Sequence, residues 1–402
     1  FNLHTVIRMP ASVFAPYTPI TTNILFFDNT HPTEETWFYR LDMPEGYKHF
    51  SKTKPMKLEH FNPVIEWWNN REELTVDGFD KSKRFTVSQL SEELGYNLDQ
   101  CGYPHEEEKI LDPMDLIQRY REERSRLNTA VDRALSHISA SLNGESVQRE
   151  IVGIDGALGR LAEIDKTFPG DMQKSLLQMA IQGKLVEQRP EEGTAEELYQ
   201  QIQAEKQALI KSGKIKKDKP LPEITDDEKP FDIPESWMWV RLGDIGSWAS
   251  GATPSRTNPD FYGGNIPWLK TGDLNDGHVS EVPEHITDEA LEKTSVRLNP
   301  VGSVLMAMYG ATIGKLAILD TPMTTNQACC ACIAAESLYN EYLFYYLLAY
   351  RKSFIKMGEG GAQPNISKEK IVGTPLSLPP LAEQKRIVAK LEELLPLCER
   401  LK

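Results

Sequence analysis

The sequence predicts an α+β chain that combines a mixed β-rich domain, long charged helices and a small α/β segment at the N-terminus. Apolar runs separated by Gly-Gly, Asn-Pro and Asp-Thr-Pro turns fill residues 236–378, a pattern typical of β-structure. Residues 112–142 and 381–402 instead carry a narrow apolar stripe at helical spacing on a charged background. Helices of that kind need a partner, so we expect a bundle or a coiled coil.

Residues 1–105 are expected to form the α/β segment. Short apolar runs bounded by turn residues predict strands at 3–8, 23–28 and 35–41, and a helix at 63–73. Residues 75–100 look irregular, apart from helical turns at 88–94. The chain begins on what reads as the middle of a β-structure, which predicts further sequence upstream.

The following stretch is expected to be mostly helical. We predict helices at residues 112–142, 151–164, 169–186 and 195–212. Residues 106–165 would form a docking helix and linker, and residues 166–235 a helical segment that ends in a Lys- and Pro-rich linker. Pro169 is expected to begin the third helix, a capping box at Thr194 to open the fourth, and Gly213 to end it.

The β-rich domain is assigned to residues 236–378. We predict strands at 238–242, 266–270, 303–309, 315–319 and 328–334, and helices at 287–293 and 338–356. Residues 379–402 then form a spacer coiled-coil helix with heptad-like apolar spacing. Pro396 is expected to kink or end that helix.

Composition limits the classes of protein that this chain can represent. A chain of 402 residues with 40% hydrophobic and 26% charged residues is expected to form about two to three globular domains. No apolar run approaches the ~18 residues of a membrane span, and the N-terminus lacks a signal-peptide layout. We therefore expect a cytoplasmic protein without a membrane partner.

Catalytic and metal-binding motifs are missing from the sequence. It contains no HExxH, GxSxG or P-loop motif, and no GxGxxG follows a strand. Cys329, Cys330 and Cys332 share one apolar run without a nearby His, which favours buried free thiols over a disulfide framework or a zinc site. We assign no catalytic, cofactor-binding or metal-binding residue to this chain.

The charge of the chain is unusual for a protein that binds nucleic acid. The net charge is −14, and residues 236–378 contain 11 Lys and Arg against 14 Asp and Glu. Phosphate neutralisation normally supplies much of the affinity for DNA. Binding to DNA would therefore depend on local geometry or on a basic partner. The basic run at Lys211–Lys219 fits either a solvated linker or a weak phosphate contact.

Several motifs of the β-rich block occur in a specific order. They are WVRLGDI, TPS, IPWLKTGDL, GATIGKLAIL, TTNQA, QPNI and PPLAEQKRIV. In this combination the block resembles a target-recognition domain of the type I restriction–modification specificity (S) subunit. FPGDMQKSLLQMAIQGKLVEQ, further upstream, is similar to the helical segment that precedes such a domain.

The N-terminal part resembles a different protein. LHTVIRMPASVFAPYTPITTNILFFD, WFYRL and GYKHFSKTKPM are similar to the C-terminal end of the N6-adenine methyltransferase (M) subunit of these systems. That family needs a glycine-containing S-adenosylmethionine loop and an Asn-Pro-Pro-aromatic motif. In this sequence Asn62-Pro63 is followed by Val, so we expect the cofactor and the catalysis upstream or in another chain.

The resemblance implies a DNA-recognition component that reads one half of a bipartite site. It implies double-stranded DNA and the M subunit as partners, with S-adenosylmethionine bound in the assembled complex. The restriction (R) subunit is a further candidate partner. One recognition domain with one spacer helix also suggests a homodimer through the spacer helices. The alternatives are a fragment of a methyltransferase–specificity fusion and an assembly scaffold that no longer binds DNA.

Candidate DNA contacts lie in the polar turns of the β-rich block. Hydroxyls and guanidinium groups suit phosphates, and Asn or Gln can read adenine. Each could equally be a surface turn or satisfy backbone groups, whereas Trp268 is expected to be core. The candidates are Thr253, Ser255, Arg256, Lys270, Thr312, Lys315, Asn326, Gln327 and Gln363.

Overall fold

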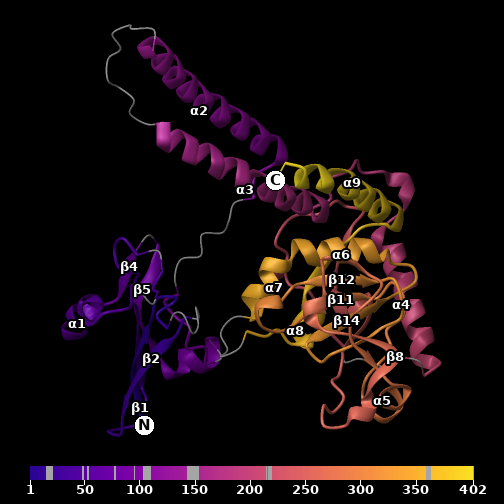
Figure 1. The fold of residues 1–402 in the computed structure, drawn as a ribbon. Helices are drawn as coiled ribbons and strands as arrows, with labels where there is room; N and C mark the ends of the chain where they lie inside the picture. Colours follow the sequence, from indigo (N-terminus) through magenta and orange to yellow (C-terminus); the bar gives the residue numbers. More distant parts are fainter. Residues whose placement is uncertain are drawn as a thin grey trace. The chain divides into compact units, whose positions relative to one another are not determined.

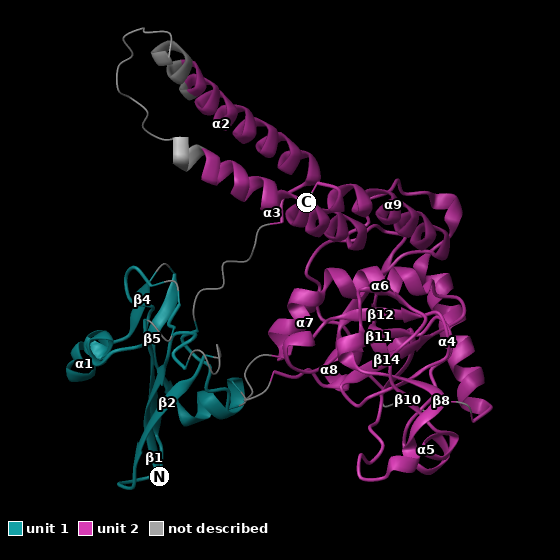
Figure 2. Ribbon diagram, in the orientation of Figure 1, with its two compact units in different colours: residues 1–108, 360–362 teal, residues 109–359, 363–402 magenta. Residues whose placement is uncertain are grey.

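The described part of the chain folds into two compact units. The computed structural model describes residues 1–14, 21–47, 49–51, 54–76, 78–94, 96–102, 110–142, 154–213, 215, 220–358 and 364–401. Phe1–Glu108 form the first unit and the rest of the described chain forms the second (Figure 2). Within the described residues, no helix combines the length and the apolar character that crossing a membrane requires.

The first unit is a five-stranded sheet with the strand order β2-β1-β3-β5-β4. Its strands are β1 (Asn2–Arg8), β2 (Asn23–Asp28), β3 (Glu35–Arg40), β4 (Leu74–Val76) and β5 (Phe79–Thr86). β1 pairs antiparallel with β2 and parallel with β3. Helix α1 (Asn62–Asn69) buries Val64 and Trp67 in a cluster with Ile7 and Tyr39. The three strands predicted from apolar runs are confirmed.

The prediction of an irregular segment at residues 75–100 is wrong, because β4 and β5 lie there. Strand β5 lacks the apolar alternation of an ordinary half-buried strand. Its Lys81 and Arg84 instead place their cationic groups 5.8 and 5.6 Å from the rings of Tyr39 and Trp37 on β3. Long charged side chains can cover apolar surface with their aliphatic stems, and this is why the strand reads as polar.

The second unit begins with a helical hairpin. Helices α2 (Pro113–Leu142) and α3 (Ile154–Ile181) pack side by side (Figure 1). Tyr120 stacks on Phe168 with ring centroids 4.1 Å apart, and Leu127 packs with Ile164. Because residue numbers rise along α2 as they fall along α3, the two helices are antiparallel.

Helix α3 corrects one expectation. The sequence predicted a weak helix and a new one beginning at Pro169, but α3 is continuous from Ile154 to Ile181 with Pro169 inside it. A proline removes one helical hydrogen bond but does not break a helix that tertiary contacts hold on both sides of it. Here α2 packs on the N-terminal half and α9 on the C-terminal half.

The β-rich part contains three sheets. A five-stranded sheet has the order β7-β14-β11-β12-β9, beside smaller sheets β10-β8-β13 and β15-β6. Their strands are β6 (Met238–Arg241), β7 (Gly246–Ser250), β8 (Tyr262–Leu269), β9 (Gly277–Val279), β10 (His285–Ile286), β11 (Val304–Ala307), β12 (Leu316–Leu319), β13 (Thr324–Thr325), β14 (Cys329–Ala334) and β15 (Pro375–Leu378). The free, buried thiols of β14 lie in this core. The mixed α+β class expected for the chain is confirmed.

Short helices accompany the sheets. They are α4 (Ala195–Lys211), α5 (Asp288–Lys293), α6 (Asn340–Ala349), α7 (Arg351–Gly358) and α8 (Lys368–Gly373). The capping box predicted at Thr194 is confirmed, because its hydroxyl accepts from the amide of Glu197 and the Glu197 carboxylate accepts in return. Gly213 follows the helix at a φ of 74°. The single helix predicted at 338–356 is two helices, α6 and α7.

Helix α9 (Leu381–Glu399) begins at the Pro379-Pro380 junction and packs antiparallel to the end of α3. Gln173 donates to Glu399 at 2.5 Å, and Gln188 donates to Glu383 at 2.5 Å. The buried Gln384 accepts from the amide of Tyr339 at 3.1 Å. The sequence predicted that Pro396 would either kink or end this helix. The helix does not end there but continues to Glu399.

Candidate nucleic-acid interface

Three of the polar turns singled out in the sequence meet at one edge of the five-stranded sheet. The registers place Ala307 opposite Cys329 and Cys330 opposite Ser250, while Met306 pairs with Leu316. The end of β7, the end of β11, and the starts of β14 and β12 therefore lie at the same edge. Residues 251–258, 308–315 and 326–328 follow or precede these ends, so the topology gathers their side chains.

A close backbone approach joins two of these loops. Gly251 donates to the carbonyl of Cys329, and Ala252 donates to that of Thr325 at 2.9 Å. A Cβ at position 251 would lie 2.2 Å from the Thr325 carbonyl oxygen, so the position requires glycine. The approach brings two candidates together, since the hydroxyl of Thr253 donates to the side-chain oxygen of Gln327.

Arg256 and Lys270, both candidates for phosphate contacts, share one acidic partner. Arg256 forms an ion pair with Glu284, and the Lys270 ammonium lies 2.8 Å from the other carboxylate oxygen. The hydrogen bonds from Arg256 and Lys270 lower the pKa of Glu284 to about 2. Glu284 is therefore ionised at neutral pH, and the three groups together carry a single positive charge.

The remaining candidates differ in how far they are free to contact a ligand. Thr312 donates its hydroxyl to the carbonyl of Tyr309. Ser255 pairs with Thr257 at 2.8 Å. The buried side-chain oxygen of Asn326 has no hydrogen-bond partner in the described part of the chain. Lys315 is exposed and has no ion-pair partner among the described residues. Gln363 lies outside the described residues.

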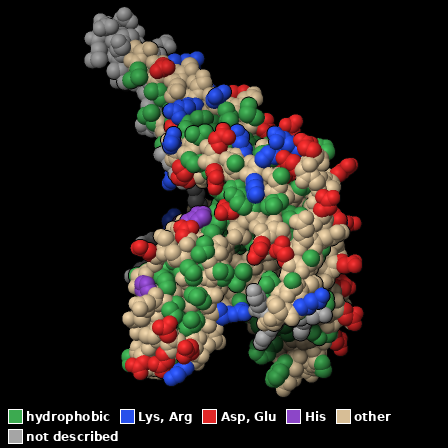
Figure 3. All heavy atoms as spheres, turned by 90° about the vertical axis from the view of Figure 1, so that its right-hand side faces the viewer, with side chains coloured by type: hydrophobic (Ala, Val, Ile, Leu, Met, Phe, Trp, Pro, Cys, Tyr) green, Lys and Arg blue, Asp and Glu red, His purple; other side chains and the backbone are tan. Residues whose placement is uncertain are grey.

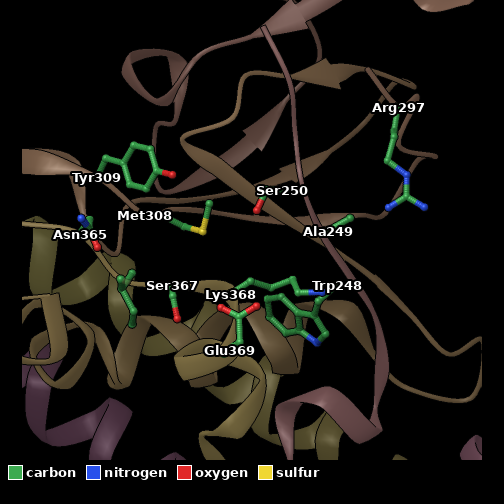
Figure 4. A pocket seen from close by; sticks show the side chains of 11 residues that line it. Trp248, Ala249, Ser250, Arg297, Met308, Tyr309, Asn365, Ser367, Lys368 and Glu369 are labelled. Carbon is green, nitrogen blue, oxygen red and sulfur yellow. The ribbon is translucent and has the colours of Figure 1, made fainter. Parts of the chain in front are cut away.

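A pocket of about 500 Å³ opens beside these loops, between β7, the Met308–Tyr309 segment and the start of α8. Figure 4 shows Tyr309 and Asn365 on one side, Arg297 on the opposite side, and Lys368 below. Neither cation forms an ion pair within the described ranges. Tyr309 is 44% exposed, so its ring is available to a ligand.

Sequence reasoning missed Glu284, Arg297 and Lys368. Nothing in the sequence around Glu284 marks it as a site residue. It reaches the site because strand pairing brings it beside β8, where its carbonyl accepts from the amide of Trp268 at 2.9 Å. Arg297 and Lys368 are 71 positions apart in the sequence yet line one pocket. A local signal existed for Lys368 alone, since Ser367 before it is a typical helix N-cap.

The charge of the second unit is mixed at its surface. The face drawn in Figure 3 shows acidic and basic side chains interspersed. In a chain with a net charge of −14, each cation that an acid does not neutralise carries more weight for an anionic ligand. Lys315, Arg297 and Lys368 are cations of this kind.

The segment Asn62–Val64 of the first unit does not fit the Asn-Pro-Pro-aromatic motif. Asn62 and Pro63 form the first turn of α1, and Val64 after them is buried in the core. Asn62 is exposed, but after Pro63 the buried Val64 stands in place of the second proline of the motif. Across the described chain, no three His, Cys, Asp or Glu side chains form a group that could hold a metal ion.

The fold and the loops define a structural class: a β-rich domain with a polar loop edge, packed on antiparallel helices. Comparison with known families makes the class specific. The type I restriction modification DNA specificity domain matches residues 234–401, and the N-6 DNA methylase family matches residues 1–110. The chain therefore combines a type I restriction–modification DNA specificity domain with a segment of the N-6 DNA methylase family.

Curated relatives agree with both matches. The type I restriction enzyme EcoEI specificity subunit of Escherichia coli is 28% identical over 68% of this chain and 48% of that subunit. The EcoAI specificity subunit of the same organism is 32% identical over 58% of this chain and 40% of that subunit. The EcoEI methylase subunit is 37% identical over 36% of this chain and 29% of that subunit. The chain thus spans about half or less of the length of these relatives.

Solved structures give a partial likeness. The HsdS subunit from Thermoanaerobacter tengcongensis is 19% identical, with a TM-score of 0.36, and the match covers 62% of this chain and 52% of that one. A chain from a study of the assembly of a type I R-M system is 21% identical, with a TM-score of 0.37 over 60% of this chain and 52% of that one.

Proposed function

We propose that this chain is the DNA-sequence-recognition component of a type I restriction–modification system. It reads one half of a bipartite site and docks the N6-adenine methyltransferase subunit. The observation that carries the proposal is the specificity-domain match over residues 234–401. Double-stranded DNA is the ligand, and the polar edge of the five-stranded sheet is the surface that meets it.

The geometry of that edge supports the proposal. Base edges and phosphates are read by amide, hydroxyl and guanidinium groups, and Gln327, Thr253 and Arg256 present these groups from neighbouring loops. Lys315, Arg297 and Lys368 supply cations without an ion-pair partner among the described residues. We assign the predicted contacts Ser255, Lys270, Thr312, Asn326 and Gln363 to the same role.

The N-terminal segment and the helices are assigned to assembly with the methyltransferase. Residues 1–105 act as a methyltransferase-like tail, and residues 106–165 and 166–235 supply the docking helices. Met114 and Leu135 on α2 are 69% and 58% exposed, as expected of a helix that meets a partner. S-adenosylmethionine is assigned to the assembled complex, and the departure of Asn62-Pro63-Val64 from the Asn-Pro-Pro-aromatic motif supports this assignment.

The spacer helix is assigned to a second contact. Residues 379–402 follow the domain of residues 236–378 and form a coiled coil with another helix. Leu397 in the last turn of α9 and Leu401, two residues beyond the helix, are 49% and 57% exposed. Two copies joined there would read a two-fold symmetric bipartite site. The restriction subunit joins the same intracellular assembly.

A second candidate function follows from the methylase match in the same chain. This chain would be part of a methyltransferase–specificity fusion whose catalytic residues lie in another part of a longer protein. The N-6 DNA methylase match over residues 1–110 favours it. The alignment with the EcoEI methylase subunit covers 29% of that subunit, so most of a methylase subunit has no counterpart in this chain.

Binding and methyl transfer together test the proposal. The purified 402-residue chain is mixed with a pool of randomised duplexes at two salt concentrations, and bound DNA is sequenced. We expect enrichment of one half-site and weaker binding at higher salt. Methyl transfer from S-adenosylmethionine should require an added modification subunit. Bound DNA without any enriched sequence, or methyl transfer by the chain alone, would contradict the proposal.

A further inference from the structure

The side chain of Arg256 is held in one place from three directions. Its guanidinium carbon lies 4.4 Å from the ring centroid of Tyr262 and 5.0 Å from that of Trp268. Its Nη1 donates to Glu284. Stacking on two aromatic rings and an ion pair fix the plane of a guanidinium more firmly than either contact alone. Nevertheless, 55% of the side chain is exposed.

The surroundings of Arg256 are themselves rigid. The Tyr262 hydroxyl donates to the carbonyl of Pro254 at 2.6 Å, and the Trp268 indole donates to that of Ala252 at 3.1 Å. Both rings belong to β8, so the loop that carries Arg256 is tied to a strand at two points before it. A recognition group supported in this way keeps its geometry better than one on a free loop.

The contact with Glu284 changes what Arg256 can recognise. An arginine that binds phosphate contributes its net charge as well as its donors, and here that charge is offset by the carboxylate. A guanidinium has five N–H donors, and Glu284 is the single acceptor that the described structure gives to those of Arg256. The other donors remain open as a planar fork, and such a fork matches the O6 and N7 acceptors of guanine.

We propose that Arg256 is a specificity-determining residue that reads a guanine in the half-site, with Glu284 as the positioning residue that aims it. This inference rests on the proposed function and deepens it. Lys270 completes the arrangement, because its ammonium on the second carboxylate oxygen keeps Glu284 in place from the other side. Arg297 and Lys368, which lack such a partner among the described residues, are left for phosphates.

The test is a selection experiment on the full chain with Arg256→Lys and Glu284→Gln. Lysine keeps the charge but loses the fork, so the preference for guanine at one position should fall by about fivefold or more. Affinity for the unselected pool should stay within about twofold of the wild type. Glu284→Gln should also reduce the guanine preference, while it raises affinity for unselected DNA and steepens the salt dependence.

Glu289→Gln is the matched control. Glu289 forms an exposed ion pair with Lys293 at 2.8 Å on α5, so its loss changes the net charge equally without touching Arg256. It should leave the selected motif unchanged. If Glu284 has only a structural role, Glu284→Gln should change the affinity for all sequences by the same factor and should not reduce the base preference at one position.

The outcomes separate this inference from the function on which it rests. If the wild type enriches a half-site and both variants enrich the same one, Arg256 does not read a base. If the variants lose the base preference at a position where the wild type does not select guanine, the assignment of the base is wrong. If the wild type enriches no sequence, the proposed function itself fails.

Discussion

Two Arg–Glu pairs in the second unit use the same groups to different ends. Arg241 and Glu228 join the linker to β6, and Arg256 and Glu284 lie at the polar edge of the domain. In both pairs the arginine lowers the pKa of its carboxyl partner to about 2. The arginines differ in exposure, since 5% of the Arg241 side chain and 55% of the Arg256 side chain are exposed.

The difference lies in how the donors are used. Arg241 donates to both carboxylate oxygens of Glu228 and to the carbonyls of Pro222, Glu223 and Gly373. Its donors are therefore filled, and it can only hold the chain together. Arg256 makes one such bond and keeps the rest of its fork open. The same ion pair is a structural bond where every donor is satisfied and a recognition device where most are not.

The largest expected effect is on local stability after Arg241→Met. The substitution removes the five hydrogen bonds of a side chain that is only 5% exposed and leaves three carbonyls without this donor, while Glu228 keeps its hydrogen bonds from Thr225. At about 1 kcal/mol for each carbonyl, we expect a loss of about 3 kcal/mol. Arg256→Met should cost under about 1 kcal/mol, because its pair is exposed to water. Hydrogen exchange measures both losses: the amides of β6 and β15 report on Arg241→Met, and the amides of β8 report on Arg256→Met.

Trp239→Phe is a control for the Arg241 measurement, since it changes a neighbouring β6 side chain and leaves the hydrogen bonds of Arg241 in place. Its effect should be smaller. Equal losses for Arg241→Met and Arg256→Met would break the comparison, because the exposed pair would then be as structural as the buried one.

The two pairs were not equally visible in the sequence. Arg241 lies in WVRLGDI, a motif that pointed to the recognition domain, but its partner Glu228 lies in a stretch that read as linker without apolar period. Arg256 was singled out for its residue type alone. Glu284 could not be found, because a pairing of Arg256 with an acid 28 positions away depends on how β8 and β10 fold together.

Local patterns predicted most of the fold. The capping box at Thr194 and the apolar runs of β1, β11 and β14 depend on neighbouring residues, so sequence reasoning found them. Strand β5 and the continuity of α3 through Pro169 depend on distant packing, and both were missed. The candidate contacts were predicted as separate turns, and the gathering of three of these turns at one sheet edge required the strand order.

A smaller effect is expected from pH. The pKa of Glu228 is about 2 in the folded chain, lowered chiefly by the hydrogen bond from Arg241, against an ordinary value of 4.5. The stability that this pair contributes is therefore complete above pH 4.5 and is lost as the pH falls toward about 2. Protection of the β6 amides, corrected for intrinsic exchange, should decline over that window.

In the Glu228→Gln variant, the β6 amides should be less protected from exchange at neutral pH than in the wild type. Their protection should also no longer decline between pH 4.5 and about 2. Glu284→Gln, which removes the other carboxyl of equally low pKa, should leave the response of β6 unchanged. A decline of the wild type that persists in Glu228→Gln would assign the acid sensitivity to another group.

The smallest expected effect distinguishes the pairs by salt. A double-mutant cycle of Arg256→Met and Glu284→Gln should give a coupling of about 0.5 kcal/mol at low salt, as is usual for exposed pairs. At about 1 M salt the screening length falls to about 3 Å, and this coupling should approach zero. The cycle of Arg241→Met and Glu228→Gln should change little, because Arg241 is shielded from ions. Salt-insensitive coupling between Arg256 and Glu284 would mean that the pair holds the fold, and the open fork of Arg256 would then be incidental to its position.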